Sequence, residues 1–174
     1  MKEIVQVGVP VLRQVAQAVP LSDIPSLRIQ KILRDMEEAL MAEPDGAALA
    51  APQIGISLRI FILSRRVFTE DGTHDTASKD PHFIYINPVI IRRSRRKSNM
   101  DEGCLSVRGK YGTIIRSTNV TIEAYDEHGL KFTRGAGGLL AQAFQHETDH
   151  LGGTLFIDTA KELWDVDIKR APRE

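Results

Sequence analysis

The pentapeptide His146-Glu147-Thr148-Asp149-His150 carries the side chains best suited to chemistry. On a helix, residues four apart lie on one face, about one turn from each other. His146 and His150 can therefore direct both imidazoles at one metal ion, and Glu147 can move protons for water that the ion activates. This spacing predicts a metal-dependent hydrolase.

The segment around the pentapeptide is predicted to form a helix from Leu139 to about Leu151, which Gly152 and Gly153 end. Apolar residues occupy two adjacent stripes of this helix, so we expect it to be buried. Burying two histidines and a glutamate without partners is unfavourable, and a bound cation would offset that cost. The alternative is a pair of core histidines that hydrogen-bond to backbone groups.

A catalytic metal site needs a third protein ligand and one open position. Phe156 stands where one familiar pattern places a third histidine, and Glu162 is the only downstream glutamate before the last residue. Cys104 is the only cysteine, and it lies in the segment Glu102–Ser106. We therefore predict Cys104 as the third ligand; the alternative is a cysteine that acts as a small buried hydrophobe.

Length and composition indicate one ordinary domain over residues 1–174. The chain is 42% hydrophobic and 26% charged, with 23 basic and 23 acidic residues. These values argue against disorder, collagen and coiled coil, and the balanced charge gives no case for DNA or a membrane. The single cysteine excludes an internal disulfide, no apolar run spans a bilayer, and the start lacks a signal-peptide core. We expect a cytoplasmic protein, or an organellar one whose leader has been removed.

Two segments in the first third must help to position the site. Apolar residues at helical spacing predict a helix over 27–41, with Ser22 and Asp23 as candidate N-caps. Segment 46–55 is small, apolar and uncharged. It is too poor in large side chains for a core strand, so we expect it to let another chain approach closely.

The other predicted elements give the fold class. They are strands at 58–63 and 83–91 around a polar surface excursion at 64–82, a hairpin at 120–134, a flexible hinge at 135–138, and a short amphipathic helix within 158–174. We predict an α+β fold in which antiparallel or mixed sheets pack around a central metal-bearing helix.

Three segments together resemble the peptide deformylase family over nearly the whole chain. They are GAALAAPQ at 46–53 followed by Ile54 and Gly55, EGCLS at 102–106, and QHETDHL at 145–151. The resemblance implies a deformylase-like fold and removal of the formyl group from the N-terminal formylmethionine of new polypeptides, with release of formate. It also implies N-formylmethionyl peptides and nascent chains as partners.

The resemblance assigns roles residue by residue. Cys104, His146 and His150 would hold the metal, and Glu147 would be the general acid and base. The side-chain amide of Gln53 and the backbone N–H of Leu105 would stabilise the oxyanion. The residues expected to bind substrate are Gly46, Ala47 and Ala48 beside its backbone, and Met100, Leu139 and Ala143 around the methionine side chain.

The metal and the partners remain partly open at this point. One thiolate and two imidazoles accept Zn²⁺, Fe²⁺, Ni²⁺ or Co²⁺, and the resemblance implies Fe²⁺ in cells, often replaced on purification. The run 92–97 holds five cations in six residues, and a second basic cluster holds Lys169, Arg170 and Arg173. Run 92–97 is either a solvated strand end or a transient contact with ribosomal RNA.

Two other functions remain as alternatives, and three residues depart from the family pattern. The alternatives are a zinc metallopeptidase that uses the same helix and a non-catalytic, deformylase-like binding protein. Ala48 replaces a frequent glycine, while Arg108 and Ile115 replace frequent prolines. Arg108 would loosen the loop after Cys104 or reach toward a substrate carbonyl.

Support for the ligands is a separate hypothesis. We expect Glu102 and Arg116 to form a partly buried ion pair that braces the loop of Cys104, because metal ligands need hydrogen-bonding support from neighbouring residues. We expect Asp149 to turn away from the side of the helix shared by His146 and His150, as a surface or support residue.

Overall fold

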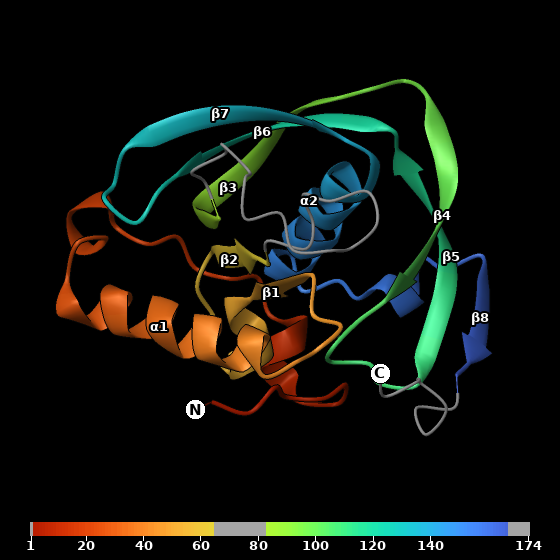
Figure 1. Ribbon diagram of the computed structural model, residues 1–174, viewed down its shortest axis with the longest axis horizontal. Helices are drawn as coiled ribbons and strands as arrows, with labels where there is room; N and C mark the ends of the chain where they lie inside the picture. Colours follow the sequence, from red (N-terminus) through yellow and green to blue (C-terminus); the bar gives the residue numbers. More distant parts are fainter. Residues whose placement is uncertain (1, 65–82, 167–174) are drawn as a thin grey trace.

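The computed structural model describes residues 2–64 and 83–166, and it is an α+β fold as predicted. Figure 1 shows helix α2 (Gly138–Leu151) near the middle, with strands arching over it and helix α1 (Leu27–Met41) lying to one side. The predicted excursion at 64–82 and the second basic cluster lie outside the described residues, apart from Ser64. Neither helix of the described part has the length and apolar content needed to span a bilayer.

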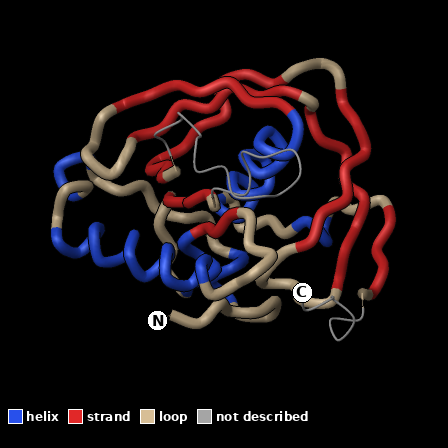
Figure 2. Tube along the Cα trace, in the orientation of Figure 1, coloured by secondary structure: helices blue, strands red, loops and turns tan. Residues whose placement is uncertain are grey.

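The strands, red in Figure 2, form two antiparallel sheets. The five-stranded sheet has the order β1-β2-β3-β6-β7, and the three-stranded sheet has the order β4-β5-β8. The strands are β1 (Ala48–Ala50), β2 (Ile60–Leu63), β3 (Ile84–Arg93), β4 (Lys97–Gly103), β5 (Lys110–Ser117), β6 (Asn119–Tyr125), β7 (Lys131–Gly137) and β8 (Glu162–Asp165). Strands β1 and β4 are edge strands, since each pairs with one neighbour only in the described part of the chain.

Aromatic packing fixes α2 against the larger sheet. Phe61 of β2 and Tyr85 of β3 stack with ring centroids 4.6 Å apart, and Phe144 of α2 lies 5.0 Å from Tyr85. All three side chains are fully buried. The face of α2 that carries Phe144 is therefore held by the core, which leaves the face with His146 for the site.

The predicted helix over 27–41 is confirmed at both ends, but its N-cap is different. Ser26 Oγ accepts a hydrogen bond from the Ile29 backbone N–H, whereas Ser22 and Asp23 belong to a separate 3-10 turn, Leu21–Asp23. Ser26 is adjacent to the first helical residue, and that position is the one from which a hydroxyl reaches the free N–H groups of the first turn.

Several other expectations were wrong, for a common reason. Ala48–Ala50 does form a buried strand, and Gly135–Gly137 pairs with β6 as part of β7 instead of forming a hinge. Residues 162–165 form strand β8 instead of a helix. Sheet hydrogen bonds join backbone groups, so small or exposed residues enter a sheet whenever a neighbouring strand offers its edge.

Candidate metal centre and cleft

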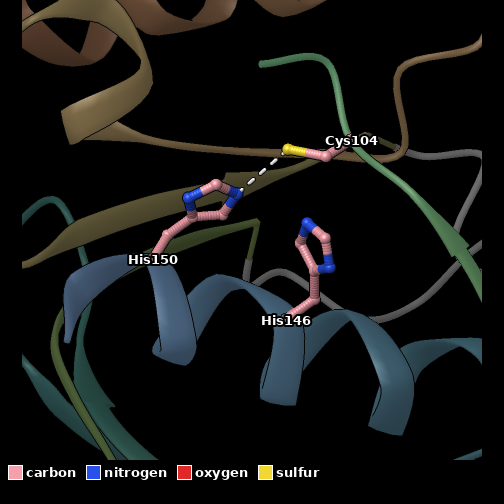
Figure 3. Close-up of side chains that lie close together, drawn as sticks. All are labelled: Cys104, His146 and His150. Carbon is pink, nitrogen blue, oxygen red and sulfur yellow. Dashed lines mark hydrogen bonds between the residues drawn. The ribbon is translucent and has the colours of Figure 1, made fainter. Parts of the chain in front are cut away.

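The three predicted ligands lie together, as Figure 3 shows. One ligand atom each from Cys104, His146 and His150 lies within 4.8 Å of the others, and Cys104 Sγ is 3.2 Å from His150 Nε2. Two elements produce this: α2 presents the histidines one turn apart, and Cys104 directly follows the last residue of β4. Ligands of a tetrahedral ion with bonds of about 2.0–2.3 Å lie roughly 3.3–3.8 Å apart, so this donor set fits a metal such as zinc or iron(II).

Glu102 holds the imidazole ring of His146 in place. Its carboxylate accepts hydrogen bonds from Arg116 Nε at 2.7 Å and Nη2 at 2.9 Å, and its Oε2 lies 2.9 Å from His146 Nδ1. Because an ionised carboxylate only accepts, Nδ1 must carry the proton and Nε2 is left to face a cation. The expected Glu102–Arg116 ion pair is confirmed.

Arg116 also joins Asp149 to this brace. Arg116 Nη1 donates to Asp149 Oδ2 at 2.5 Å, so Asp149 supports the same arginine that holds Glu102. Burial alone would raise the pKa of Glu102, but the hydrogen bonds from Arg116 and His146 outweigh burial and lower that pKa to about 2. The Glu102 carboxylate is therefore ionised at any physiological pH.

The second carboxylate of the site has the opposite surroundings. Glu147 is 3% exposed, and its Oε2 has no hydrogen-bond partner among the described residues. Burial raises the pKa of Glu147 to about 7, and the neighbouring charges of Glu102 and Asp149 raise it against the opposing effect of His146. Glu147 is thus a carboxyl group that can hold or release a proton near neutral pH.

The two imidazoles also differ in their electrostatics. Burial would lower the pKa of His146, but its interactions with Cys104 and Glu102 outweigh burial and raise that pKa well above its usual value. Burial and the charge of His146 both lower the pKa of His150, whose Nδ1 has no hydrogen-bond partner in the described part of the chain. A neutral His150 is ready to act as a ligand.

Gln53 is fixed beside the sulfur. Its Oε1 accepts a hydrogen bond from the Ala50 backbone N–H at 2.8 Å, so its Nε2 points at Ser106 Oγ, 3.2 Å away, and at Cys104 Sγ, 3.5 Å away. The Leu105 backbone N–H finds no acceptor among the described residues, while the Leu105 carbonyl accepts from Gln6 Nε2 at 3.0 Å. Two N–H donors therefore flank Cys104.

A cleft of about 760 Å³ opens onto these groups. Four of the six predicted substrate-binding residues line it: Ala47, Ala48, Leu139 and Ala143. Gly46 and Met100 do not. Gly46 faces α1, because an added Cβ would lie 2.7 Å from Leu40 Cδ1, and Met100 is cross-strand from Ile114 in the β4–β5 pair, away from the cleft lining.

Other lining residues escaped the sequence analysis. Tyr111, Gln142, Asp165 and Val166 all line the cleft. Tyr111 lies on β5, which the sequence did not predict, and Asp165 on a segment expected to be helical, so no pattern marked them. The unexpected part of the fold therefore supplies one end of the cleft.

The departures from the family pattern cause no strain. Asn87 is the only non-glycine residue with positive φ in the described part, so alanine at 48 is unstrained. Arg108 does not reach into the cleft as a free group: its Nη2 is 2.6 Å from Glu43 Oε1, which ties the loop after Cys104 to the turn after α1. Ile115 is exposed on β5.

Comparison with known proteins gives a consistent result. The family model described as polypeptide deformylase matches residues 1–165. Peptide deformylase 1A, chloroplastic/mitochondrial, of Arabidopsis thaliana is 40% identical over 162 residues, which cover 90% of this chain but 60% of that protein. Peptide deformylase of Dehalococcoides mccartyi is 39% identical over 157 residues, covering 90% of this chain and 84% of that protein. The crystal structure of peptide deformylase from Thermotoga maritima has a TM-score of 0.79 at 32% identity and covers 93% of this chain and 99% of its own.

Proposed function

The chain belongs to the polypeptide deformylase family, and from this premise we propose that it removes the formyl group from the N-terminal formylmethionine of new polypeptides. The products are formate and a peptide with a free amine. One observation carries the proposal: Cys104, His146 and His150 place their donors within 4.8 Å of one another beside the buried, unpaired carboxylate of Glu147.

We propose that Cys104, His146 and His150 hold one divalent ion, Fe²⁺ in cells and Zn²⁺, Ni²⁺ or Co²⁺ in some purified samples. Such an ion is a Lewis acid that lowers the pKa of a coordinated water toward neutrality. The brace of Glu102 and Arg116 orients His146 so that its Nε2 stays available.

Glu147 moves the proton in this mechanism. Its carboxylate accepts a proton from the attacking water and later gives it to the nitrogen of the leaving methionine amine. Burial raises the pKa of Glu147 above the ordinary value of a glutamate, which favours a group that both takes up and gives back a proton. Burial keeps competing water from the carboxyl group.

Two donors stabilise the negative charge that develops on the formyl oxygen. Gln53 Nε2 lies 3.5 Å from Cys104 Sγ, and the Leu105 N–H belongs to the residue that follows Cys104. The bond from the Ala50 N–H to Gln53 Oε1 fixes the amide in its donating orientation. Donors that are oriented before the reaction need no rearrangement when the charge forms. Glutamine also stays neutral and so does not compete for the cation.

The cleft suits an extended peptide. Ala47 and Ala48, at the edge strand β1, present only methyl groups, so another backbone can approach and pair with them. Leu139 and Ala143 of α2 line the same cleft and offer apolar walls for the methionine side chain. The edge strand β4 borders the cleft through Asp101, Glu102 and Gly103.

Formate release tests this function. The protein is loaded with Fe²⁺ without oxygen and given formyl-Met-Ala-Ser, with acetyl-Met-Ala-Ser and unmodified Met-Ala-Ser as controls. We expect formate from the formylated peptide alone, and a loss of about 10²- to 10⁴-fold in kcat for Glu147→Ala, which lacks the proton carrier.

The same assay separates the alternatives. Cleavage of the unmodified peptide would favour the metallopeptidase, which Cys104 as third ligand already argues against. Normal metal content without formate release would favour a non-catalytic binding protein. Equal rates for the parent and Glu147→Ala would contradict the proposed role of Glu147.

We also propose where in the cell the protein acts and that it contacts the ribosome. We expect action on nascent chains in the cytoplasm or in an organelle; the Arabidopsis relative is named chloroplastic/mitochondrial. Five exposed cations at the end of β3, in the turn after it and at the start of β4 support transient contact with ribosomal RNA: Arg92, Arg93, Arg95, Arg96 and Lys97. If ribosome co-sedimentation at low salt survives glutamine substitution of these five residues, that contact is excluded.

A further inference from the structure

Strand β8 extends the cleft beyond the methionine slot. Asp165 and Val166 line the cleft together with Lys110 and Tyr111 of β5. Lys110 Nζ lies 2.7 Å from Asp165 Oδ1, and the Val166 N–H donates to the Gly109 carbonyl at 2.8 Å, so this end of β8 is joined to β5 and the turn before it. Figure 1 shows β8 as the outermost strand beside β5.

A flat aromatic surface begins at this end of the cleft. Tyr111 and Trp164 are directly opposite each other across β5 and β8, with ring centroids 6.5 Å apart and an angle of 25° between the rings. Tyr111 also lies over Gly103, since a Cβ there would come within 2.8 Å of the Tyr111 ring. We call Gly103, Tyr111 and Trp164 the aromatic shelf.

Both rings of the aromatic shelf are partly exposed to solvent. Tyr111 is 40% exposed and Trp164 is 38% exposed, whereas Tyr85 and Phe61 in the core are fully buried. Exposed tyrosine and tryptophan next to a binding cleft commonly anchor a partner, because they bury a large area with few rotatable bonds. The shelf continues directly from the cleft through Tyr111 and Gly103, the latter adjacent to Cys104.

We propose that the aromatic shelf binds the part of the formylated polypeptide that follows its methionine, and that it favours apolar and aromatic side chains there. This inference rests on the proposed deformylation, which fixes the formyl end beside Cys104. Adjacent strands lie about 4.8 Å apart, so Trp164 is about 10 Å from Gly103 across two strand spacings. An extended peptide covers that distance in about three residues at about 3.3 Å each, which places the contact at about the third to fifth residue after methionine.

Trp164 itself supplies a direct probe, because it is the only tryptophan of the chain. Metal-loaded Glu147→Gln is titrated with formyl-Met-Ala-Ser-Phe-Phe-Ser, formyl-Met-Ala-Ser-Asp-Asp-Ser and formyl-Met-Ala-Ser. We expect the phenylalanine peptide to change the tryptophan emission at lower concentration than the aspartate peptide, and the tripeptide to leave the emission unchanged. Equal responses to the two hexapeptides, or none, would overturn the proposal.

Kinetics of the otherwise unaltered enzyme give a second measure. We expect Trp164→Ser to lower kcat/KM for the phenylalanine peptide about 5- to 10-fold, as for an aromatic interface anchor, and to leave formyl-Met-Ala-Ser unaffected. Trp164→Phe should retain most of the parent value. The matched control is Leu163→Ser, because Leu163 is the neighbouring residue on β8, is 49% exposed and points to the opposite face of the strand.

The outcomes separate the two proposals. If the parent releases no formate from any peptide, the proposed function fails, while the fluorescence titration still tests the shelf. If formate is released but Trp164→Ser and Leu163→Ser behave alike on both peptides, the shelf proposal fails alone. A shift from dimer to monomer for Trp164→Ser in sedimentation velocity, with no change in peptide kinetics, would assign the shelf to self-association and overturn the proposal.

Discussion

Two buried carboxylates of the site, one in contact with His146 and one on the next residue of the chain, have opposite surroundings. Glu102, from β4, is held by Arg116 and His146, and these bonds lower its pKa to about 2. Glu147, from α2, has one carboxylate oxygen, Oε2, without a hydrogen-bond partner among the described residues, and burial raises the pKa of this group to about 7. The residues are the same type and lie within one site, so the environment alone sets their roles.

The comparison separates support from chemistry. A carboxylate that is fully hydrogen-bonded contributes to stability and holds its neighbours in place, but it has no reason to exchange protons. An unpaired buried carboxylate destabilises the fold and gains reactivity. The brace around Glu102 therefore stabilises a fold that must also accommodate Glu147.

The largest effect is expected when the brace is broken. Arg116→Met leaves Glu102 buried without its main partner, and losing one partner of a buried ion pair typically destabilises by about 3–5 kcal/mol. Urea unfolding of the metal-free protein measures this. Arg95→Met, at an exposed position, should change the unfolding free energy by less than about 0.5 kcal/mol, and similar values for the two variants would contradict the bracing role.

A smaller and opposite effect is expected at Glu147. Its folded pKa is raised from 4.5 to about 7, so the contribution of Glu147 to the stability of the metal-free protein is fully present below pH 4.5 and is lost as the pH rises through about 7. At about 1.36 kcal/mol per pKa unit, Glu147→Gln should be more stable than the parent by about 3 kcal/mol at pH 8.

The pH profile distinguishes the two carboxylates. The advantage of Glu147→Gln should vanish near pH 4, where the parent glutamate is protonated in both states. Glu102 has the opposite sign: its lowered pKa gives stability that is present above pH 4.5 and is lost as the pH falls through about 2. A Glu147→Gln advantage that is independent of pH would show that ionisation of Glu147 is not the cause.

The sequence predicted the metal ligands better than it predicted the strands of the two sheets. The spacing of His146 and His150 and the single Cys104 were enough to predict a cluster, because a helix brings residues four apart together wherever it lies. The helix over 27–41 was predictable for the same local reason, from apolar spacing alone.

Non-local pairing accounts for what was missed. Strand β4 contains one large apolar residue, Met100, so its sequence gives no strand pattern, and only its pairing with β5 makes it a strand. Strand β8 likewise becomes a strand only through its pairing with β5, which lies some 50 residues earlier along the chain. Gly46 and Met100 do not line the cleft, because the cleft walls depend on where β1 and β4 meet, which no local pattern encodes.

The smallest effect is expected at an exposed ion pair near the cleft. Arg108 and Glu43 are 2.6 Å apart, like Arg116 and Glu102 at 2.7 Å, but the Arg108 side chain is 42% exposed. Exposed pairs contribute about 0–1 kcal/mol, so Arg108→Ala should lower the midpoint of thermal unfolding only slightly. A loss as large as that of Arg116→Met would mean that burial does not decide the strength of these pairs.

The central claim is that Cys104, His146 and His150 share one ion. X-ray absorption at the zinc edge of the zinc-loaded protein tests it most directly. We expect one zinc per chain with one sulfur at about 2.3 Å and two imidazole nitrogens at about 2.0–2.1 Å, and loss of the sulfur signal in Cys104→Ser. A spectrum of the parent that contains only nitrogen and oxygen neighbours would contradict the proposed metal centre.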